Sequence, residues 1–352
     1  MPISPEVPDV RRRWRTAQAV AFGVGLAVFA ALVFWPEAGL TVLWSFLIPV
    51  APALVAFVPG VWRNLCPLAW VALLPARLGI GWDRPSSPRQ RAWFARIGVV
   101  LLLAIIPLRH VVLDLNGPAT AALLAGAVFA AVGMGLLFRQ KSGWCSGVCP
   151  IHPVERLYGV APAVAVANAH CGACRTCVAP CPDSVAESDA LTANGDPWHK
   201  LTGLLMAGAF PGYVWGWFHV PHYAGGEGWR HLDQAYGLPL LGGASTLAAF
   251  LLLRAWMPAG RLPLLFRAFA ASAIGCYYWY RVPSLFGLGL FPGDGVLVDL
   301  HTVLPVWFVE VSRGATTLLC AWWFLARGHI RRPWTVRPPV MPCLATAAPL
   351  QV

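Results

Sequence analysis

Eight apolar segments, each long enough to cross a lipid bilayer, constrain the fold of this chain more than any other feature. A bilayer core about 30 Å thick is spanned by about 20 residues of helix. The eight segments cover residues 17–35, 40–58, 95–113, 119–138, 201–220, 238–257, 262–280 and 303–326. Because 58% of all residues are hydrophobic and only 12% are charged, a soluble fold of this size is excluded. We therefore predict an all-α polytopic membrane protein with these eight transmembrane helices.

The basic residues predict the orientation of the helices. Cytoplasmic loops of membrane proteins carry an excess of Lys and Arg. The loops on the side of the N-terminus hold most of the arginines, in the stretches 11–15, 63–91 and 327–337. The opposite loops are richer in acidic residues, namely Glu37, Asp114, Glu227, Asp233, Asp294 and Asp299. We expect a multi-pass protein of the bacterial cytoplasmic (inner) membrane with both termini in the cytoplasm. The net charge of +11 reflects this asymmetry, so no nucleic acid partner is expected.

A compact run of cysteines indicates a cofactor. The spacing is C-x2-C-x2-C-x3-C-P, as in bacterial ferredoxins, and the run consists of Cys171, Cys174, Cys177, Cys181 and Pro182. A structural zinc site is the alternative, but such sites usually combine two short cysteine knuckles that lie a dozen or more residues apart. We predict that these cysteines hold a 4Fe-4S cluster in a short ferredoxin-like cytoplasmic loop.

Further cysteines lie on the same predicted side of the membrane. Cys149 and Cys66 are each followed by proline, and each Cys-Pro pair follows two predicted helices. The first half therefore resembles a duplicated unit, in which Trp62 takes the place that Cys145 has in the second copy. We predict Cys145 and Cys149 as cluster ligands, and Cys66 is a further candidate ligand. With Cys343 in the C-terminal tail, the thiols would suffice for a second cluster.

These features divide the chain into four parts. Residues 1–138 form a four-helix membrane half with the Cys-Pro repeat, and 139–200 form the cytoplasmic ferredoxin-like segment. Residues 201–326 form a second four-helix membrane half, and 327–352 form a Pro-rich cytoplasmic tail. The cluster loop thus joins two membrane halves.

The cysteine pattern resembles that of the polyferredoxin-type membrane 4Fe-4S proteins. This group includes the membrane quinol dehydrogenase subunit of periplasmic nitrate reduction, the membrane protein that supports nitrous oxide reductase, and the copper reductase of cytochrome oxidase assembly. The resemblance covers residues 59–182 and rests on Cys66, Cys145, Cys149, Cys171, Cys174, Cys177 and Cys181. It implies electron transfer at the membrane, with quinone as the substrate.

Candidates for quinone and proton chemistry lie towards the opposite face. His219 and His222 lie at the end of the fifth predicted helix, and Glu310 lies in the eighth, three residues before Arg313. Ionisable groups within a membrane usually face a partner or a water-filled cavity. A mutually neutralising Glu310–Arg313 pair and ordinary interfacial histidines are the alternatives. We do not expect haem, because a bis-histidine haem needs two facing histidines deeper in the bilayer.

The leading hypothesis is an oxidoreductase subunit that passes electrons between the quinone pool and a redox partner protein through the cytoplasmic 4Fe-4S cluster or clusters. One alternative is a metal reductase or maturation factor that reduces copper or iron for another enzyme. Another is an iron–sulfur redox sensor or transporter. The sequence contains no nucleotide-binding glycine motif, so flavin and NAD are not indicated.

Overall fold

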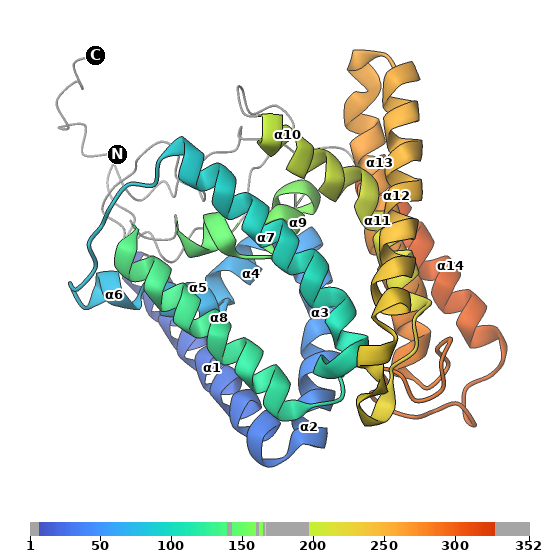
Figure 1. Ribbon diagram of the computed structural model, residues 1–352, viewed down its shortest axis with the longest axis horizontal. Coiled ribbons are helices and arrows are strands. Elements are labelled where there is room, and N and C mark those ends of the chain that lie inside the picture. Colours follow the sequence, from blue (N-terminus) through green and yellow to red (C-terminus); the bar gives the residue numbers. More distant parts are fainter. Residues whose placement is uncertain (1–6, 139–142, 160–161, 165, 167–196, 328–352) are drawn as a thin grey trace.

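The computed structural model in Figure 1 describes residues 7–138, 143–159, 162–164, 166 and 197–327. Within these residues, every regular element is a helix and no strand is formed. The ferredoxin-like run at 171–182 and the tail with Cys343 lie outside the described residues.

The first half contains four of the predicted spans. Helix α1 (Val7–Phe34) is followed by a bent span made of α2 (Pro36–Leu40), the π-helical η1 (Thr41–Leu47) and α3 (Ile48–Phe57). Three short helices then lie between the second and third spans, namely α4 (Pro59–Leu65), α5 (Pro67–Ala72) and α6 (Leu74–Arg77). The next two spans are α7 (Pro88–Leu108), which the π-helical η2 (Arg109–Leu113) extends, and α8 (Gly117–Leu137).

The second half is also helical. The π-helical η3 (Trp144–Val148) and α9 (His152–Tyr158) precede a long bent helix made of α10 (Pro197–Leu204), η5 (Leu205–Ala209) and α11 (Phe210–Phe218). After η6 (Ala224–Arg230) come α12 (Leu232–Trp256), η7 (Ala259–Arg261), α13 (Leu262–Leu285), α14 (Trp307–Ala321) and η8 (Trp322–Ala326). The last span begins at Trp307 rather than at the predicted residue 303, because the chain up to Pro305 forms turns.

Five helices of the described part are long and apolar enough to cross a membrane, namely Arg12–Phe34, Pro36–Phe57, Ala92–Leu113, Gly117–Leu137 and Leu232–Trp256. They coincide with predicted segments 17–35, 40–58, 95–113, 119–138 and 238–257. The other three predicted segments are helical too, at 197–218, 262–285 and 307–326, but are not among these five. The chain is thus a helical protein suited to a lipid bilayer, and the total of eight spans stays a prediction.

Aromatic side chains of the second half bind backbone carbonyls of α7 in the first half. Pro107 has no N–H, so the carbonyl of Leu103 lacks its helical donor. The hydroxyl of Tyr213 donates to that oxygen at 2.6 Å. The Tyr236 hydroxyl and the Trp217 indole donate in the same way to the carbonyls of Ala104 and Ile106, at 2.8 and 3.0 Å. These bonds fix α11 and α12 against α7.

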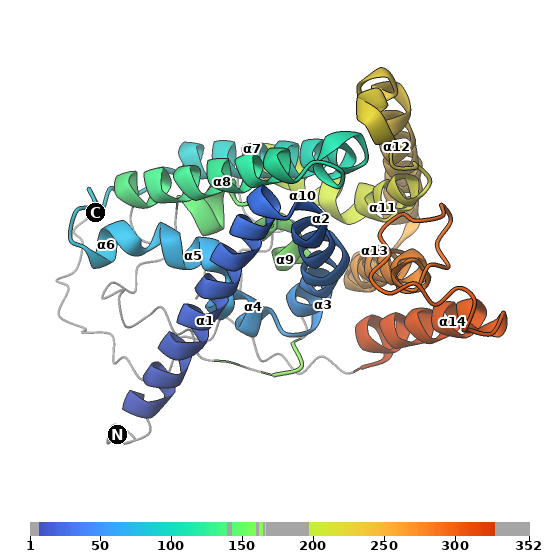
Figure 2. The same ribbon diagram turned by 90° about the horizontal axis from the view of Figure 1, so that it is seen from below.

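Glycines allow α11 to lie directly on α12. Gly208, Gly212 and Gly216 recur every four residues and therefore share one face of the helix. A Cβ at Gly212 would lie 1.9 Å from the carbonyl oxygen of Gly242, and a Cβ at Gly216 would lie 2.3 Å from that of Leu238. Small residues at this spacing let membrane helices approach closely. In Figures 1 and 2, α11 and α12 lie side by side, with α13 and α14 packed beside them.

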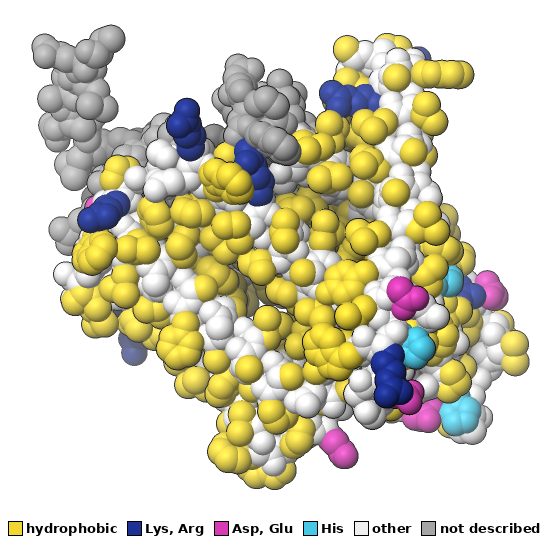
Figure 3. Space-filling view, viewed as in Figure 1, with side chains coloured by type: hydrophobic (Ala, Val, Ile, Leu, Met, Phe, Trp, Pro, Cys, Tyr) yellow, Lys and Arg dark blue, Asp and Glu magenta, His cyan; other side chains and the backbone are white. Residues whose placement is uncertain are grey.

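Charged side chains divide between the two ends of the molecule. In the space-filling view, most of the visible Lys and Arg lie towards the end at which α10 begins, and Asp, Glu and His gather near the opposite end (Figure 3). Hydrophobic side chains cover the surface between them. This division follows the charge pattern read from the sequence.

Candidate functional site

Two Cys-Pro turns near the end at which α10 begins have the same backbone conformation. Cys66 has φ −56° and ψ 117°, and Cys149 has φ −57° and ψ 121°. The Cys66 N–H donates to the carbonyl of Trp62, and the Cys149 N–H donates to that of Trp144, each at 2.9 Å. The second turn contains one more residue, which η3 accommodates as a π turn. The backbone therefore matches Trp62 with Trp144 rather than with Cys145.

The two turns lie near each other. Burial raises the pKa of the Cys149 thiol to about 12, and the neighbouring Cys66 is the second largest cause of this shift. Cys145 and Cys149 pack against buried Trp144. A buried ion pair between Arg63 of α4 and Glu155 of α9 joins the segments around the turns. The structure thus brings the Cys66 and Cys149 turns together.

The structure does not describe the predicted cluster ligands of the ferredoxin-like run. Cys171, Cys174, Cys177 and Cys181 lie outside the described residues. Within the described ranges, no group of three or more His, Cys, Asp or Glu side chains is placed to hold a metal ion. The described thiols Cys66, Cys145 and Cys149 would therefore need ligands from the ferredoxin-like segment to complete a four-thiolate set. Thiolate donors are what a 4Fe-4S cluster requires, so these residues fit that cofactor chemically.

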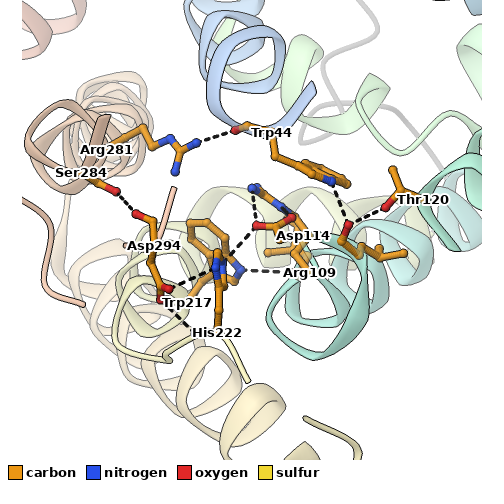
Figure 4. A network of polar contacts seen from close by, with 11 residues as sticks. Trp44, Arg109, Asp114, Thr120, Trp217, His222, Arg281, Ser284 and Asp294 are labelled. Carbon is orange, nitrogen blue, oxygen red and sulfur yellow. Dashed lines mark hydrogen bonds and ion pairs between the residues drawn. The ribbon is translucent and has the colours of Figure 1, made fainter. Parts of the chain in front are cut away.

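A buried charged network occupies the opposite end (Figure 4). Arg109 donates from Nε and Nη2 to the two carboxylate oxygens of Asp114, at 2.9 and 3.0 Å. His222 places Nε2 3.1 Å from Asp114 Oδ2 and Nδ1 3.3 Å from Asp294 Oδ1. The His222 backbone N–H also donates to Asp294, at 2.9 Å. Asp114 thus binds both Arg109 and His222, and Asp294 binds the other ring nitrogen of His222.

Local structure explains why these side chains meet. The π-helical η2 carries Arg109, and Asp114 follows at its end. The indole of Trp44 and the hydroxyl of Thr120 both donate to the Leu113 carbonyl beside Asp114. The Arg109 guanidinium lies 4.2 Å from the ring centre of Trp44 and 4.7 Å from that of Trp217, a cation–π arrangement. Three distant parts of the chain therefore enclose the ion pair.

Charge in the network sets the protonation of His222. Burial alone would lower its pKa, but the hydrogen bonds to Asp114 and Asp294 outweigh burial and raise the pKa to about 9. Burial would likewise raise the pKa of Asp114, yet Arg109 and His222 hold it below its usual range. At neutral pH, His222 is therefore an imidazolium that donates from both nitrogens. In that state it has no lone pair with which to accept a proton from a quinol.

His110 is a buried histidine with unusual surroundings. Its side chain is 3% exposed, and neither ring nitrogen has a hydrogen-bond partner within the described part of the chain. The ring lies 4.7 Å from that of Trp217 and 4.9 Å from that of His222, measured between centres. Nothing in the sequence around His110 indicates this burial.

The remaining predicted residues lie outside the network. His219 Nδ1 is 2.8 Å from the carbonyl oxygen of Trp215, so Nδ1 carries the hydrogen and Nε2 is left as an acceptor. Arg313 donates to Glu310 at 3.2 Å across one turn of α14, and the Glu310 side chain is 73% exposed. Of the three candidates, the structure therefore joins only His222 to the buried network. Sequence reasoning did not find the network, because its acidic members were counted only as loop charges.

Comparison with known protein families, with curated proteins and with solved structures found no match for this chain.

Proposed function

We propose that this chain is a membrane electron-transfer protein that exchanges electrons between the quinone pool and a redox partner protein through 4Fe-4S chemistry on its cytoplasmic side. The observation that carries the proposal is the ferredoxin spacing of Cys171, Cys174, Cys177 and Cys181. A compact run of this kind, placed between two groups of membrane helices, suits a cofactor that exchanges electrons at the bilayer surface.

The two Cys-Pro turns support the proposal from a second direction. Cys66 and Cys149 lie in turns of the same conformation, close enough to influence each other electrostatically. Cys149 is 22 residues before Cys171 in the chain. Under this proposal, the turns supply thiolates to the same cofactor region as the ferredoxin-like run. The orientation that goes with the proposal places this end in the cytoplasm, where the basic residues concentrate.

Quinol oxidation requires proton acceptors as well as an electron acceptor. A quinol gives up two electrons and two protons, and a 4Fe-4S cluster takes one electron at a time. Under this proposal, the chain handles those protons near His219 and Glu310, towards the face opposite the cluster. His222 takes a structural part, because its imidazolium is already bound by two carboxylates.

The test begins with anaerobic purification of the full chain and measurement of iron and acid-labile sulfide. We expect a brown protein with four irons per cluster, and a reduced-cluster electron paramagnetic resonance signal after addition of a quinol analogue. A Cys174→Ala variant should lose iron. Cys320→Ala is the matched control, because Cys320 is a buried thiol packed in the apolar core. A colourless protein with stoichiometric zinc would overturn the proposal.

A further inference from the structure

A groove runs between α11, α13 and the α14–η8 helix. Its volume is about 430 Å³. Residues that line it include Trp215, Trp279 and Tyr280 at one end and Ala268, Ala271 and Leu325 at the other. Ala268 and Tyr280 are twelve residues apart, which corresponds to a rise of roughly 18 Å along α13. The groove is therefore elongated and lies along the helices.

The two ends of the groove differ in chemistry. The end with Ala268 and Leu325 is mainly aliphatic, and the Ser272 hydroxyl near it donates back to the Ala268 carbonyl. The other end is aromatic and carries the phenol of Tyr280 near the indole of Trp215. The thiol of Cys276 lies one turn below Tyr280 in the same wall. A ligand that matches this gradient has a flat polar ring at one end and an apolar chain at the other.

His219 lies beside the aromatic end. Its ring centre is 4.2 Å from that of Trp215 and 5.4 Å from that of Tyr280. Because Nδ1 is committed to the Trp215 carbonyl, Nε2 is available to accept a hydrogen bond. A quinol hydroxyl can donate to such a nitrogen, and the Tyr280 hydroxyl can donate to a quinone carbonyl.

The Glu310–Arg313 ion pair flanks the same end. The Arg313 guanidinium lies 5.4 Å from the ring centre of Trp279, a lining residue, and it is ion-paired with Glu310 at 3.2 Å. The ion pair leaves this edge without net charge. A phospholipid headgroup gains little from such a surface, whereas a neutral ring can stack on the tryptophans. The aromatic end therefore favours an uncharged aromatic ligand.

We propose that this groove is the quinone-binding site, with the quinone ring beside Tyr280 and His219 and the isoprenoid chain along Ala268 and Leu325. The proposal rests on the proposed function, which names quinone as the substrate. It adds the location of the site, and it makes His219 a binding residue.

A filling substitution tests the location directly. The Ser272 side chain is exposed in the groove and bonds only to its own helix, at Ala268, so Ser272→Phe fills the groove without entering the core. Leu252→Phe is the matched control, because Leu252 is 64% exposed on α12 and is not a lining residue. Binding of decylubiquinone to the purified protein is measured in lipid nanodiscs. We expect Ser272→Phe to weaken binding at least about ten-fold and Leu252→Phe to leave it unchanged.

A second variant and a photolabel keep the test decisive. His219→Leu should weaken binding by about ten-fold, because leucine has no hydrogen-bond acceptor, and this variant does not depend on how the chain tolerates Phe at 272. An azidoquinone should label the peptide that contains residues 272–280. If both variants bind decylubiquinone with the affinity of the wild type, or if the label attaches elsewhere, the proposed site is wrong. The proposed function is then left in place. Displacement of the label by phospholipid as readily as by quinone would show an acyl-chain groove. Absence of quinone binding by the iron-loaded wild type overturns the quinone part of the proposed function, and the site with it.

Discussion

The buried network around His222 predicts a specific pH dependence of stability. Substitution of His222 by Gln keeps a side chain of similar size but removes the charge that lies between Asp114 and Asp294. The pKa of His222 is raised from 6.5 to about 9. At 1.36 kcal/mol per pKa unit, the protonated ring contributes about 3 kcal/mol to the free energy of unfolding.

The sign of the effect follows from the direction of the shift. Below pH 6.5 the folded and unfolded states both hold the proton, so the whole contribution is present. Between pH 6.5 and about 9, only the folded state keeps the proton, and the contribution declines as the pH rises. Above this range the contribution is lost. The stability difference between wild type and His222→Gln should therefore fall from about 3 kcal/mol at pH 6 to near zero above pH 9.

The assay is unfolding in mixed detergent micelles, measured for both proteins across pH 5.5–10. His301→Gln provides the matched control, because His301 also pairs with an aspartate, Asp299, at 2.7 Å, but with 58% of its side chain exposed. Solvent screens such a surface pair, so this variant should change the pH dependence little. A difference between wild type and His222→Gln that stays constant with pH, or that grows towards alkaline pH, would refute the reasoning.

Three further predictions concern Asp114, the crossing of α11 and α12, and Cys66. Asp114→Asn should destabilise the protein by about 3–5 kcal/mol in the same unfolding assay, because Arg109 would remain buried without a counter-charge; a loss below about 1 kcal/mol would contradict the importance of this pair. Gly212→Ala should cost about 2 kcal/mol or more, because its Cβ would overlap a carbonyl of α12, whereas Gly237→Ala, with nothing within 4 Å, should be neutral or stabilising by up to about 1 kcal/mol. If two clusters are present, Cys66→Ala should lower the iron content from about eight towards about four per chain, and an unchanged value would exclude Cys66 as a ligand.

Much of the fold could be predicted because membrane spans are a local property of the sequence. Length and apolar content alone identify the five spans, without knowledge of any contact between them. The last helix shows where this reasoning stops. Residues 303–306 are as apolar as the span that follows, and Pro305 leaves them in turns before α14 begins at Trp307.

The candidate site was less accessible to sequence reasoning. Asp114 and His222 are 108 residues apart, and Asp294 is a further 72 residues along the chain, so only the packing of the helices brings them together. The glycine repeat 208-212-216 was visible in the sequence and could have predicted the close crossing of α11 and α12. The cysteine spacing, in contrast, carries its chemical meaning within eleven residues, and the proposal of an iron–sulfur cofactor depends on it.

The hydrogen bonds from Tyr213, Tyr236 and Trp217 to α7 have a consequence for biosynthesis. Until the second half has been inserted, the Leu103 carbonyl next to Pro107 has neither a helical donor nor a tyrosine hydroxyl. An unsatisfied carbonyl in hydrocarbon costs several kcal/mol. In a nascent chain that stops before α11, this helix therefore stays incomplete in the bilayer until translation supplies the missing donors.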